Sequence, residues 1–272
     1  MSTKLPNKLL RIALLQNDAG LDMVANNNWI QSHLPAAGSV DLIVLTEMFA
    51  LRGGDSDYRA MSEPLKGLTC EWLAAEARRR KTWILAGSLV EKKGQKLYNT
   101  AVLFDRKGTI AAVYRKMHLF DAKLVNAKTI CESDLFTAGN EKVLVDIDGW
   151  CCGLSICYDI RFPELYRYYS KHGAHLILVP ANFTYLTGKD HWRTLIMARA
   201  IENQSFVVAA NQCGINPVSQ VKSYGHSLVV SPWGKELAKG DNRPAVIKAV
   251  LDPQLLREAR ERVPALNHRR LA

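Results

Sequence analysis

The stretch GLSICYDIRFPELYR, residues 153–167, decides the fold class because it passes from an apolar strand through a turn into a helix. The apolar run predicts a strand over residues 150–156, and the residues that follow predict a helix over 162–172. Cys157 lies at the elbow, where backbone N–H groups point outward and can stabilise an oxyanion. A cation or a helix N-terminus there would lower the pKa of the thiol and make it reactive. The local sequence by itself still favours a buried structural cysteine.

The same alternation of apolar runs and helical patterns extends over the chain in both directions. Further strands are predicted at residues 11–16, 41–46, 83–90, 97–104, 110–114, 143–147, 174–180, 205–211, 226–230 and 245–251. Helices are predicted at residues 22–34, at 70–81 with Thr69 as N-cap, at 190–203 with Asp190 as N-cap, and after Asp252-Pro253. The pattern therefore predicts an α/β protein.

Short turns and the lack of linkers predict how these elements assemble. Residues 92–95 and 106–108 form short turns, so the strands that they join are expected to be antiparallel neighbours. Many strands with few helices predict two packed sheets covered outside by helices, a four-layer α-β-β-α sandwich. No repeat or Pro/Gly/Ser-rich linker interrupts the chain, so residues 1–272 are expected to form a single domain. Residues 116–141 have no clean period and predict a functional or mobile loop.

The charge of the chain says little about its partners. The 272 residues carry a formal net charge of +10, with a pI near 9.3. The basic cluster at residues 78–81 ends a predicted helix, where cations interact favourably with the helix dipole. No nucleic-acid-reading motif accompanies the charge, so no nucleic-acid partner is expected. Without a long apolar stretch or signal-peptide features, the sequence predicts a soluble cytoplasmic protein with no membrane partner.

The cysteines and histidines do not indicate a disulfide framework or a metal site. None of the six cysteines forms a CxxC pair, and the chain is too large to resemble a disulfide scaffold. Cys151 and Cys152 lie in an apolar run and are expected to be inert core thiols. The seven histidines show no ligand spacing, and His118 and His191 are expected to be structural. We therefore expect no metal and no organic cofactor.

Two charged residues stand where other predicted strands end. Glu47 directly follows DLIVLT, and Lys116 directly follows IAAVYR. Either residue alone would usually mark the exit of a strand to solvent. Together with Cys157, however, they place a carboxylate, an ammonium and a thiol at three strand ends. These groups supply a general base, an electrophilic cation and a nucleophile, the minimum for amide cleavage through a thioester.

These motifs resemble those of the nitrilase superfamily of carbon–nitrogen hydrolases, whose hallmark is a Glu–Lys–Cys triad. Glu47 in LTEMF, Lys116 in YRKMHLFD and Cys157 in GLSICYDIRFPELYR match the family's three segments in order. The segments TGKDHWRTLIMARAIENQ (187–204) and SYGHSLVVSPWGKELA (223–238) are typical of its small amidases. The resemblance runs across nearly the whole chain. It implies the four-layer sandwich and assembly into a homodimer or a larger homo-oligomer.

The resemblance also implies a role for each residue. Glu47 would act as the base and Cys157 as the nucleophile, while Lys116 and the backbone N–H of Tyr158 would stabilise the oxyanion. Related amidases carry a second glutamate at about the position of Glu132, which lies 16 residues after Lys116. Glu132 is therefore implied to hold Lys116 and to assist the base. The alternative for Glu132 is a solvated loop carboxylate.

The residues after the nucleophile bear on the substrate. YDIR at residues 158–161 is the pattern of small amidases that act on carboxylate-bearing amides. Arg161 is expected either to bind that carboxylate in a bidentate manner or to brace the elbow by pairing with Asp159 or Glu164. A small-molecule amide is therefore the expected partner. The expected substrate-contacting residues are Tyr158, Arg161, Asn182 and Phe183.

Within the family, the resemblance is nearest to the deaminated glutathione amidases. The alternatives are an omega-amidase acting on 2-oxoglutaramate and an N-carbamoyl amide hydrolase. Asn182 stands where the first two branches usually have a small residue, and Lys189-Asp190 replaces a common Pro-Ala pair, so the shape of the pocket stays open. A catalytically silent binding relative would lack a triad member, and all three members are present.

Overall fold

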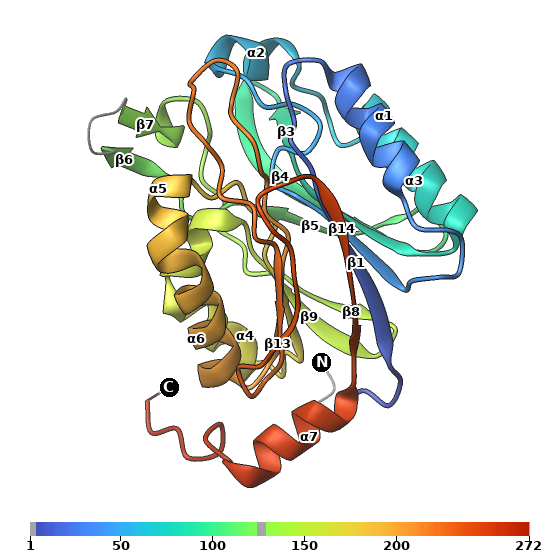
Figure 1. Cartoon of the computed structure of the whole chain (residues 1–272), viewed down its shortest axis with the longest axis vertical. Coiled ribbons are helices and arrows are strands. Elements are labelled where there is room, and N and C mark those ends of the chain that lie inside the picture. The colour runs from blue at the N-terminus through green and yellow to red at the C-terminus, as the bar shows by residue number, and fades with distance from the viewer. Residues whose placement is uncertain (1–3, 124–128, 272) are drawn as a thin grey trace.

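The computed structural model, which describes residues 4–123 and 129–271, contains two six-stranded sheets packed face to face. Helices cover the outer face of each sheet, and the two sheets lie between them (Figure 1). The predicted four-layer α-β-β-α sandwich is therefore confirmed. No helix in the described part of the chain is long and apolar enough to cross a membrane.

The first sheet has a parallel centre and antiparallel edges. β1, β2 and β3 run parallel, β14 pairs antiparallel with β1, and β4 and β5 continue the other edge as an antiparallel meander. The antiparallel pairing predicted across the two short turns is thus confirmed. In sheet order, the strands are β14 (Ala245–Leu251), β1 (Leu10–Gln16), β2 (Leu42–Leu45), β3 (Trp83–Lys93), β4 (Lys96–Phe104) and β5 (Ile110–Arg115).

The second sheet repeats this plan. Its centre, β9, β10 and β11, is parallel, and β8, β12 and β13 pair antiparallel at the edges. In sheet order, the strands are β13 (Glu236–Lys239), β12 (Leu228–Val230), β11 (Phe206–Ala209), β10 (Leu176–Leu178), β9 (Trp150–Leu154) and β8 (Leu144–Ile147). β13 begins near the end of the family-typical segment 223–238, where the sequence pattern predicted no strand after residue 230.

The helices connect the strands and close the ends of the sandwich. The α-helices are α1 (Met23–His33), α2 (Asp55–Ala60), α3 (Leu68–Arg80), α4 (Pro163–Lys171), α5 (Tyr185–Thr187), α6 (Arg193–Asn203) and α7 (Pro253–Arg262). Short helical turns are η1 (Glu132–Asp134), η2 (Cys157–Arg161) and the π-helical η3 (Gly188–Trp192). The predicted helices near residues 22–34, 70–81, 162–172 and 190–203 and after Asp252-Pro253 are present.

The apolar runs are continuous because both faces of their strands are buried. Along β1, Ile12 and Leu14 belong to the core between the sheets, whereas Ala13 and Leu15 pack toward α1 and α3. A strand turns successive side chains to opposite faces, so each run must be apolar throughout to supply two layers at once. This is why the sequence signal for these strands was strong.

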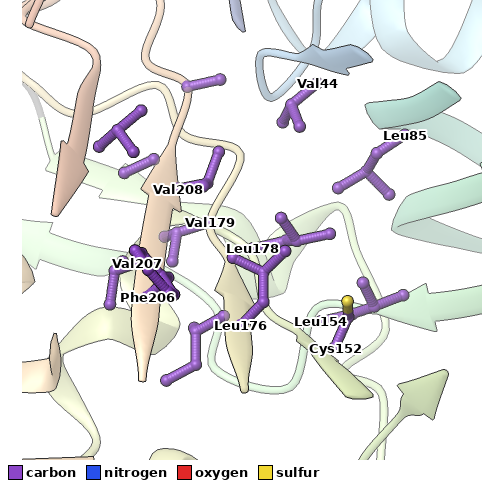
Figure 2. Packing of buried hydrophobic residues seen from close by; sticks show 14 of the residues in the cluster. Val44, Leu85, Cys152, Leu154, Leu176, Leu178, Val179, Phe206, Val207 and Val208 are labelled. Atoms are coloured by element: carbon purple, nitrogen blue, oxygen red, sulfur yellow. The ribbon is translucent and has the colours of Figure 1, made fainter. Parts of the chain in front are cut away.

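Figure 2 shows the core between the two sheets, with Val44 and Leu85 on one side facing Leu178 and Leu154 on the other. Val44 and Leu85 come from β2 and β3, while Leu154 and Leu178 end β9 and β10. All four side chains are fully buried. Burial of this kind contributes about 1.5–3 kcal/mol per large apolar side chain, which fixes the two sheets against each other.

Two predicted N-caps are wrong. Gly67, not Thr69, caps α3, because the Glu63 carboxylate lies outside the helix and accepts the Thr69 N–H at 3.1 Å. Asp190 lies inside a helical segment that already begins at α5 after Thr184 and passes through the π-helical turn η3. A tertiary contact with Glu63 determines where α3 begins, and a preceding turn determines where the helix containing Asp190 begins. The local N-cap preference of Thr69 and Asp190 therefore does not decide either helix start.

The stretch 116–141 is partly regular. β6 (Asp121–Lys123) and β7 (Thr129–Cys131) form a small antiparallel sheet, and η1 follows directly. In Figure 1 this sheet lies near α5 at the left edge of the view, and residues of β7 and α5 line the same cavity. Residues 124–128, which belong to the predicted loop, lie outside the described residues.

A close backbone approach beside β2 gives a testable prediction. A Cβ atom at Gly87 would lie 2.0 Å from the carbonyl oxygen of Leu45 and 2.3 Å from that of Thr46. Gly87→Ala is therefore expected to lower the free energy of unfolding by about 1–3 kcal/mol, because β3 must move away from β2. Urea unfolding measures this. Gly20→Ala is the control, since a Cβ atom at Gly20 meets nothing within 4 Å, and equal stability of the two variants would contradict the prediction.

Candidate active site

The topology brings the ends of several strands to one end of the sandwich. β5 runs in the same direction as β2, because two antiparallel steps separate it from β3, which is parallel to β2. β9 and β10 are parallel in the opposite sheet. Residues that follow β2, β5 and β10 in the chain contact one another, since Glu47 binds both Lys116 and the backbone of Asn182, and Cys157 after β9 lines the same cavity. The predicted site residues lie there.

Glu47 is a buried carboxylate held by three donors. Its Oε1 atom accepts hydrogen bonds from Lys116 Nζ and Asn99 Nδ2, each at 2.9 Å. Its Oε2 atom accepts the backbone N–H of Asn182 at 2.7 Å. Only 3% of Glu47 is exposed. The carboxylate is thus fixed in one orientation, which a proton acceptor in a catalytic site requires.

The backbone around Glu47 is fixed as well. Met48 follows it in the left-handed region, with φ of 53°. The side-chain amide of Gln212 donates to the carbonyl oxygens of Glu47 and Met48 at 3.2 and 3.0 Å, and Ser88 Oγ accepts the Met48 N–H. This irregular turn is stabilised from both neighbouring elements, so Glu47 leaves its strand facing the other sheet rather than solvent.

Lys116 lies between two carboxylates and is 1% exposed. Its Nζ atom is 2.9 Å from Glu47 Oε1 and 2.8 Å from Glu132 Oε2. Burial alone would lower the pKa of the ammonium, but the charges of Glu132 and Glu47 raise this pKa well above its ordinary value. Lys116 therefore keeps its proton and acts as a fixed positive charge.

Glu132 is not a solvated loop carboxylate. It opens η1, its side chain contacts Lys116, and its Oε2 atom accepts the Phe120 N–H at 2.7 Å. Burial and the nearby charge of Glu47 raise the pKa of Glu132, although Lys116 opposes this. The contact that the family resemblance implied between Glu132 and Lys116 is present.

Cys157 occupies the predicted elbow. It begins η2 with φ of 45°, a strained conformation for a non-glycine residue, and its N–H donates to the Pro180 carbonyl at 2.8 Å. The pKa of its thiol is raised well above the ordinary value, because burial and the charge of Glu47 outweigh the attraction of Lys116. A cation at this elbow could have lowered the thiol pKa, but burial and Glu47 prevail over Lys116 here. The resting thiol is neutral and needs a base.

Asp159 connects the Cys157 elbow to the segment that carries Lys116. Its fully buried carboxylate accepts the Tyr114 hydroxyl at 2.7 Å, the Ile156 N–H at 2.8 Å and the backbone N–H of His118 at 3.1 Å. The His118 ring lies 2.7 Å from the same carboxylate. This agrees with the structural role expected for His118.

Arg161 does not brace the elbow, since Asp159 has other partners and no acidic side chain in the described residues forms an ion pair with Arg161. Its guanidinium lies 5.2 Å from the ring centroid of Phe183 and 5.8 Å from that of Tyr158. A ring nitrogen of His191 is 3.4 Å away. The alternative expectation, an arginine available to an anionic ligand, matches this environment.

One cavity of about 340 Å³ contains all the predicted site residues. Glu47, Lys116, Glu132 and Cys157 line it together with Tyr158, Arg161, Asn182 and Phe183. Other lining residues come from α2, β7, the segment after η1 and the loop before β12. These include Tyr58, Ile130, Phe136, Asn216 and Ser223.

Sequence reasoning missed the residues that hold the site in place. Asn99 and Gln212 are fully buried amides that bind Glu47 and its backbone. A signal existed for Asn99, because a polar residue interrupts the apolar strand KLYNTAVLF. A buried polar side chain in a strand needs a partner and therefore marks a specific contact. Gln212 follows its strand in an irregular segment and carried no such signal.

A thiol, a carboxylate and an ammonium that line one cavity are the groups that a thiol-dependent hydrolase needs. The family model for carbon–nitrogen hydrolases matches residues 11–261. The chain belongs to the carbon–nitrogen hydrolase family. The predicted membership of the nitrilase superfamily is confirmed, and the protein is an amide-hydrolysing enzyme.

Similar proteins include enzymes of two activities. A deaminated glutathione amidase from Synechocystis is 38% identical over 265 residues, which cover 92% of this chain and 97% of that protein. An omega-amidase from Xenopus tropicalis is 35% identical over 235 residues, covering 86% and 85%. The structure of an amidase from Nesterenkonia sp. AN1, with the acetamide moiety of fluoroacetamide attached to its active-site cysteine, superposes with a TM-score of 0.77. It is 26% identical and covers 99% of this chain and 100% of that chain.

The raised pKa of the Cys157 thiol yields a prediction. Glu47→Gln removes a negative charge beside the thiol, so the thiol pKa is expected to fall and its alkylation by iodoacetamide to shift to lower pH. Amide hydrolysis by the same variant is expected to fall by about 10²–10⁴-fold. Mass spectrometry of the Cys157 peptide across pH measures the first effect.

The control for this experiment is Glu164→Gln, which neutralises an exposed carboxylate on α4. Its alkylation profile should match that of the wild type. An unchanged profile for Glu47→Gln, or one shifted to higher pH, would contradict the influence of Glu47 on the thiol.

Proposed function

We propose that this enzyme hydrolyses small carboxylate-bearing amides of 2-oxo acids through a Cys157 thioester, with deaminated glutathione as the leading substrate. The observation that carries the proposal is the cavity in which the Arg161 guanidinium and the Cys157 thiol both lie. An arginine without an acidic partner in the described residues can bind a substrate carboxylate and present the amide to the thiol. The deaminated glutathione amidase and the omega-amidase among the relatives support this substrate class.

The first half of the reaction forms the thioester. Glu47 accepts the proton of the Cys157 thiol while the sulfur attacks the amide carbonyl carbon. The carbonyl oxygen gains a negative charge, which the Lys116 ammonium and the backbone N–H of Tyr158 stabilise. Tyr158 is the second residue of η2, where a helical N–H has no acceptor within its own helix. Glu47 then gives its proton to the amide nitrogen, the C–N bond breaks, and the amine or ammonia leaves.

The second half releases the acid. Glu47, again a carboxylate, accepts a proton from a water molecule whose oxygen attacks the thioester carbon. The same two donors stabilise the second oxyanion. When the C–S bond breaks, the proton on Glu47 returns to the Cys157 sulfur, and the carboxylic acid departs. The neutral resting thiol is restored, in agreement with its raised pKa.

Glu132 supports this cycle through Lys116. With one carboxylate on each side, the ammonium stays in place when Glu47 becomes protonated in the middle of a turnover. Lys116 then still has a negative partner and remains aimed at the oxyanion. Without Glu132, protonation of Glu47 would leave a buried ammonium unpaired, which is costly in a protein interior.

We also propose a homodimer or larger homo-oligomer and a cytoplasmic location. Ile201, Trp233 and Val263 are about half exposed, and such apolar side chains are suited to a subunit contact. None of the six cysteines, all of which lie in the described residues, forms a disulfide, as is usual in a reducing compartment.

Activity measurements on a substrate panel test the proposed function. Wild-type enzyme is expected to hydrolyse deaminated glutathione or 2-oxoglutaramate faster than N-carbamoyl amino acids or nitriles. Cys157→Ala is expected to lose about 10³-fold or more in kcat, because the nucleophile is absent. Cys131→Ala, which removes another thiol from the cavity wall, is the matched control and should keep most activity. Turnover of a nitrile without amide hydrolysis would contradict the assignment.

Arg161→Met tests how the carboxylate is recognised. We expect kcat/KM for carboxylate-bearing amides to fall by about 10–100-fold, since a charge-assisted hydrogen-bonded pair is lost. Hydrolysis of an uncharged amide such as butyramide should change little. Steady-state kinetics on both substrates measure the difference, and equal losses on the two would show that Arg161 does not recognise the carboxylate.

A further inference from the structure

Asn182 departs from the small residue expected at its position and lies beside the reacting groups. Its backbone N–H donates to Glu47 at 2.7 Å, and this hydrogen bond would form with any residue except proline. The amide side chain therefore serves some other purpose. It lines the same cavity as Cys157 and Arg161.

The orientation of the Asn182 amide is fixed by a chain of donors. A guanidinium can only donate, so Arg52 donates to Ser223 Oγ at 2.9 Å, and Ser223 must direct its own hydrogen elsewhere. That hydrogen goes to Asn182 Oδ1 at 2.5 Å. Arg52 is itself fully buried and held by Asp18 and the Cys213 carbonyl. The Asn182 oxygen is thereby committed to Ser223.

The Asn182 NH₂ group is then the end that remains for a ligand. None of the described residues accepts a hydrogen bond from Asn182 Nδ2. Nor is Nδ2 one of the fully buried polar atoms that lack a partner, which is what we expect of an atom open to the cavity. The positive charge of Arg161 lines the same space. Two donors in one cavity suit a ligand with a carboxylate and a further oxygen next to it.

We propose that Asn182 is a specificity-determining residue whose NH₂ group donates to the 2-oxo oxygen of the substrate, next to the carboxylate bound by Arg161. This inference rests on the proposed function. The NH₂ group at this place can donate to a carbonyl oxygen, but it disfavours an ammonium group, which is also a donor. Asn182 therefore favours the 2-oxo acid amide over the corresponding 2-amino acid amide. Ser223 and Arg52 act as positioning residues through Asn182.

Three amides with one carbon skeleton test this inference. 2-Oxoglutaramate carries the oxygen, glutaramate has a methylene group instead, and glutamine carries an ammonium. For Asn182→Ala we expect kcat/KM on 2-oxoglutaramate to fall by about 10–100-fold, because the site loses its donor, while the value for glutaramate stays within about threefold. Ser223→Ala should give a smaller loss on the same substrate, because the amide becomes free to rotate.

Asn182→Asp provides the sharper variant. This variant keeps the oxygen that accepts from Ser223 but replaces the NH₂ donor with a carboxylate oxygen. The kcat/KM for 2-oxoglutaramate divided by that for glutamine should therefore fall by about 100-fold or more. Iodoacetamide labelling of Cys157 in Asn182→Ala should match the wild type, since the backbone hydrogen bond to Glu47 is retained.

The outcomes separate the two proposals. If Asn182→Ala lowers kcat/KM equally for 2-oxoglutaramate and glutaramate, or for neither, Asn182 does not read the 2-oxo oxygen, and only this inference is overturned. If the wild type hydrolyses none of the three amides and no deaminated glutathione, the proposed function itself is wrong.

Discussion

The site depends on one buried ammonium, that of Lys116, placed between the carboxylates of Glu47 and Glu132. Taking these charges out of water is costly, and the cost is offset only if each charge finds partners of good geometry. The surrounding structure supplies them. Asn99 and the backbone of Asn182 donate to Glu47, and the backbone of Phe120 donates to Glu132. Because these donors come from both sheets and from the segment after β5, the charges and the sandwich stabilise each other.

The same ion cluster sets the chemistry. Burial and the charge of Glu47 keep the Cys157 thiol neutral, so in the proposed reaction proton transfer is coupled to the attack on the substrate. A permanently ionised thiolate would react with any electrophile that entered the cavity. Asp159 adds rigidity by connecting the Cys157 elbow to Tyr114 and His118, on either side of Lys116. The proposed nucleophile and the cation are therefore positioned by one buried carboxylate that takes no part in the proposed reaction.

The sequence predicted the strands well because strands buried on both faces read as continuous apolar runs, as in β1 and β2. It was less accurate at helix starts. Thr69 and Asp190 are good caps in isolation, but Glu63 and the turn at Thr184 take over that function in the folded chain. For Arg161 the residues left two alternatives, and the choice depended on which groups Asp159 contacts. Such contacts join residues far apart in the chain, and local pattern does not contain them.

The sequence by itself determined the α/β sandwich, the family and the three strand ends that carry Glu47, Lys116 and Cys157, because periodicity and ordered motifs are local properties. Only the tertiary structure decided that Glu132 contacts Lys116, that the thiol is neutral at rest, and that the side-chain oxygen of Asn182 accepts from Ser223. Proton affinity and hydrogen-bond direction depend on burial and on neighbours brought together by folding. They are fixed only when both sheets close around the cavity.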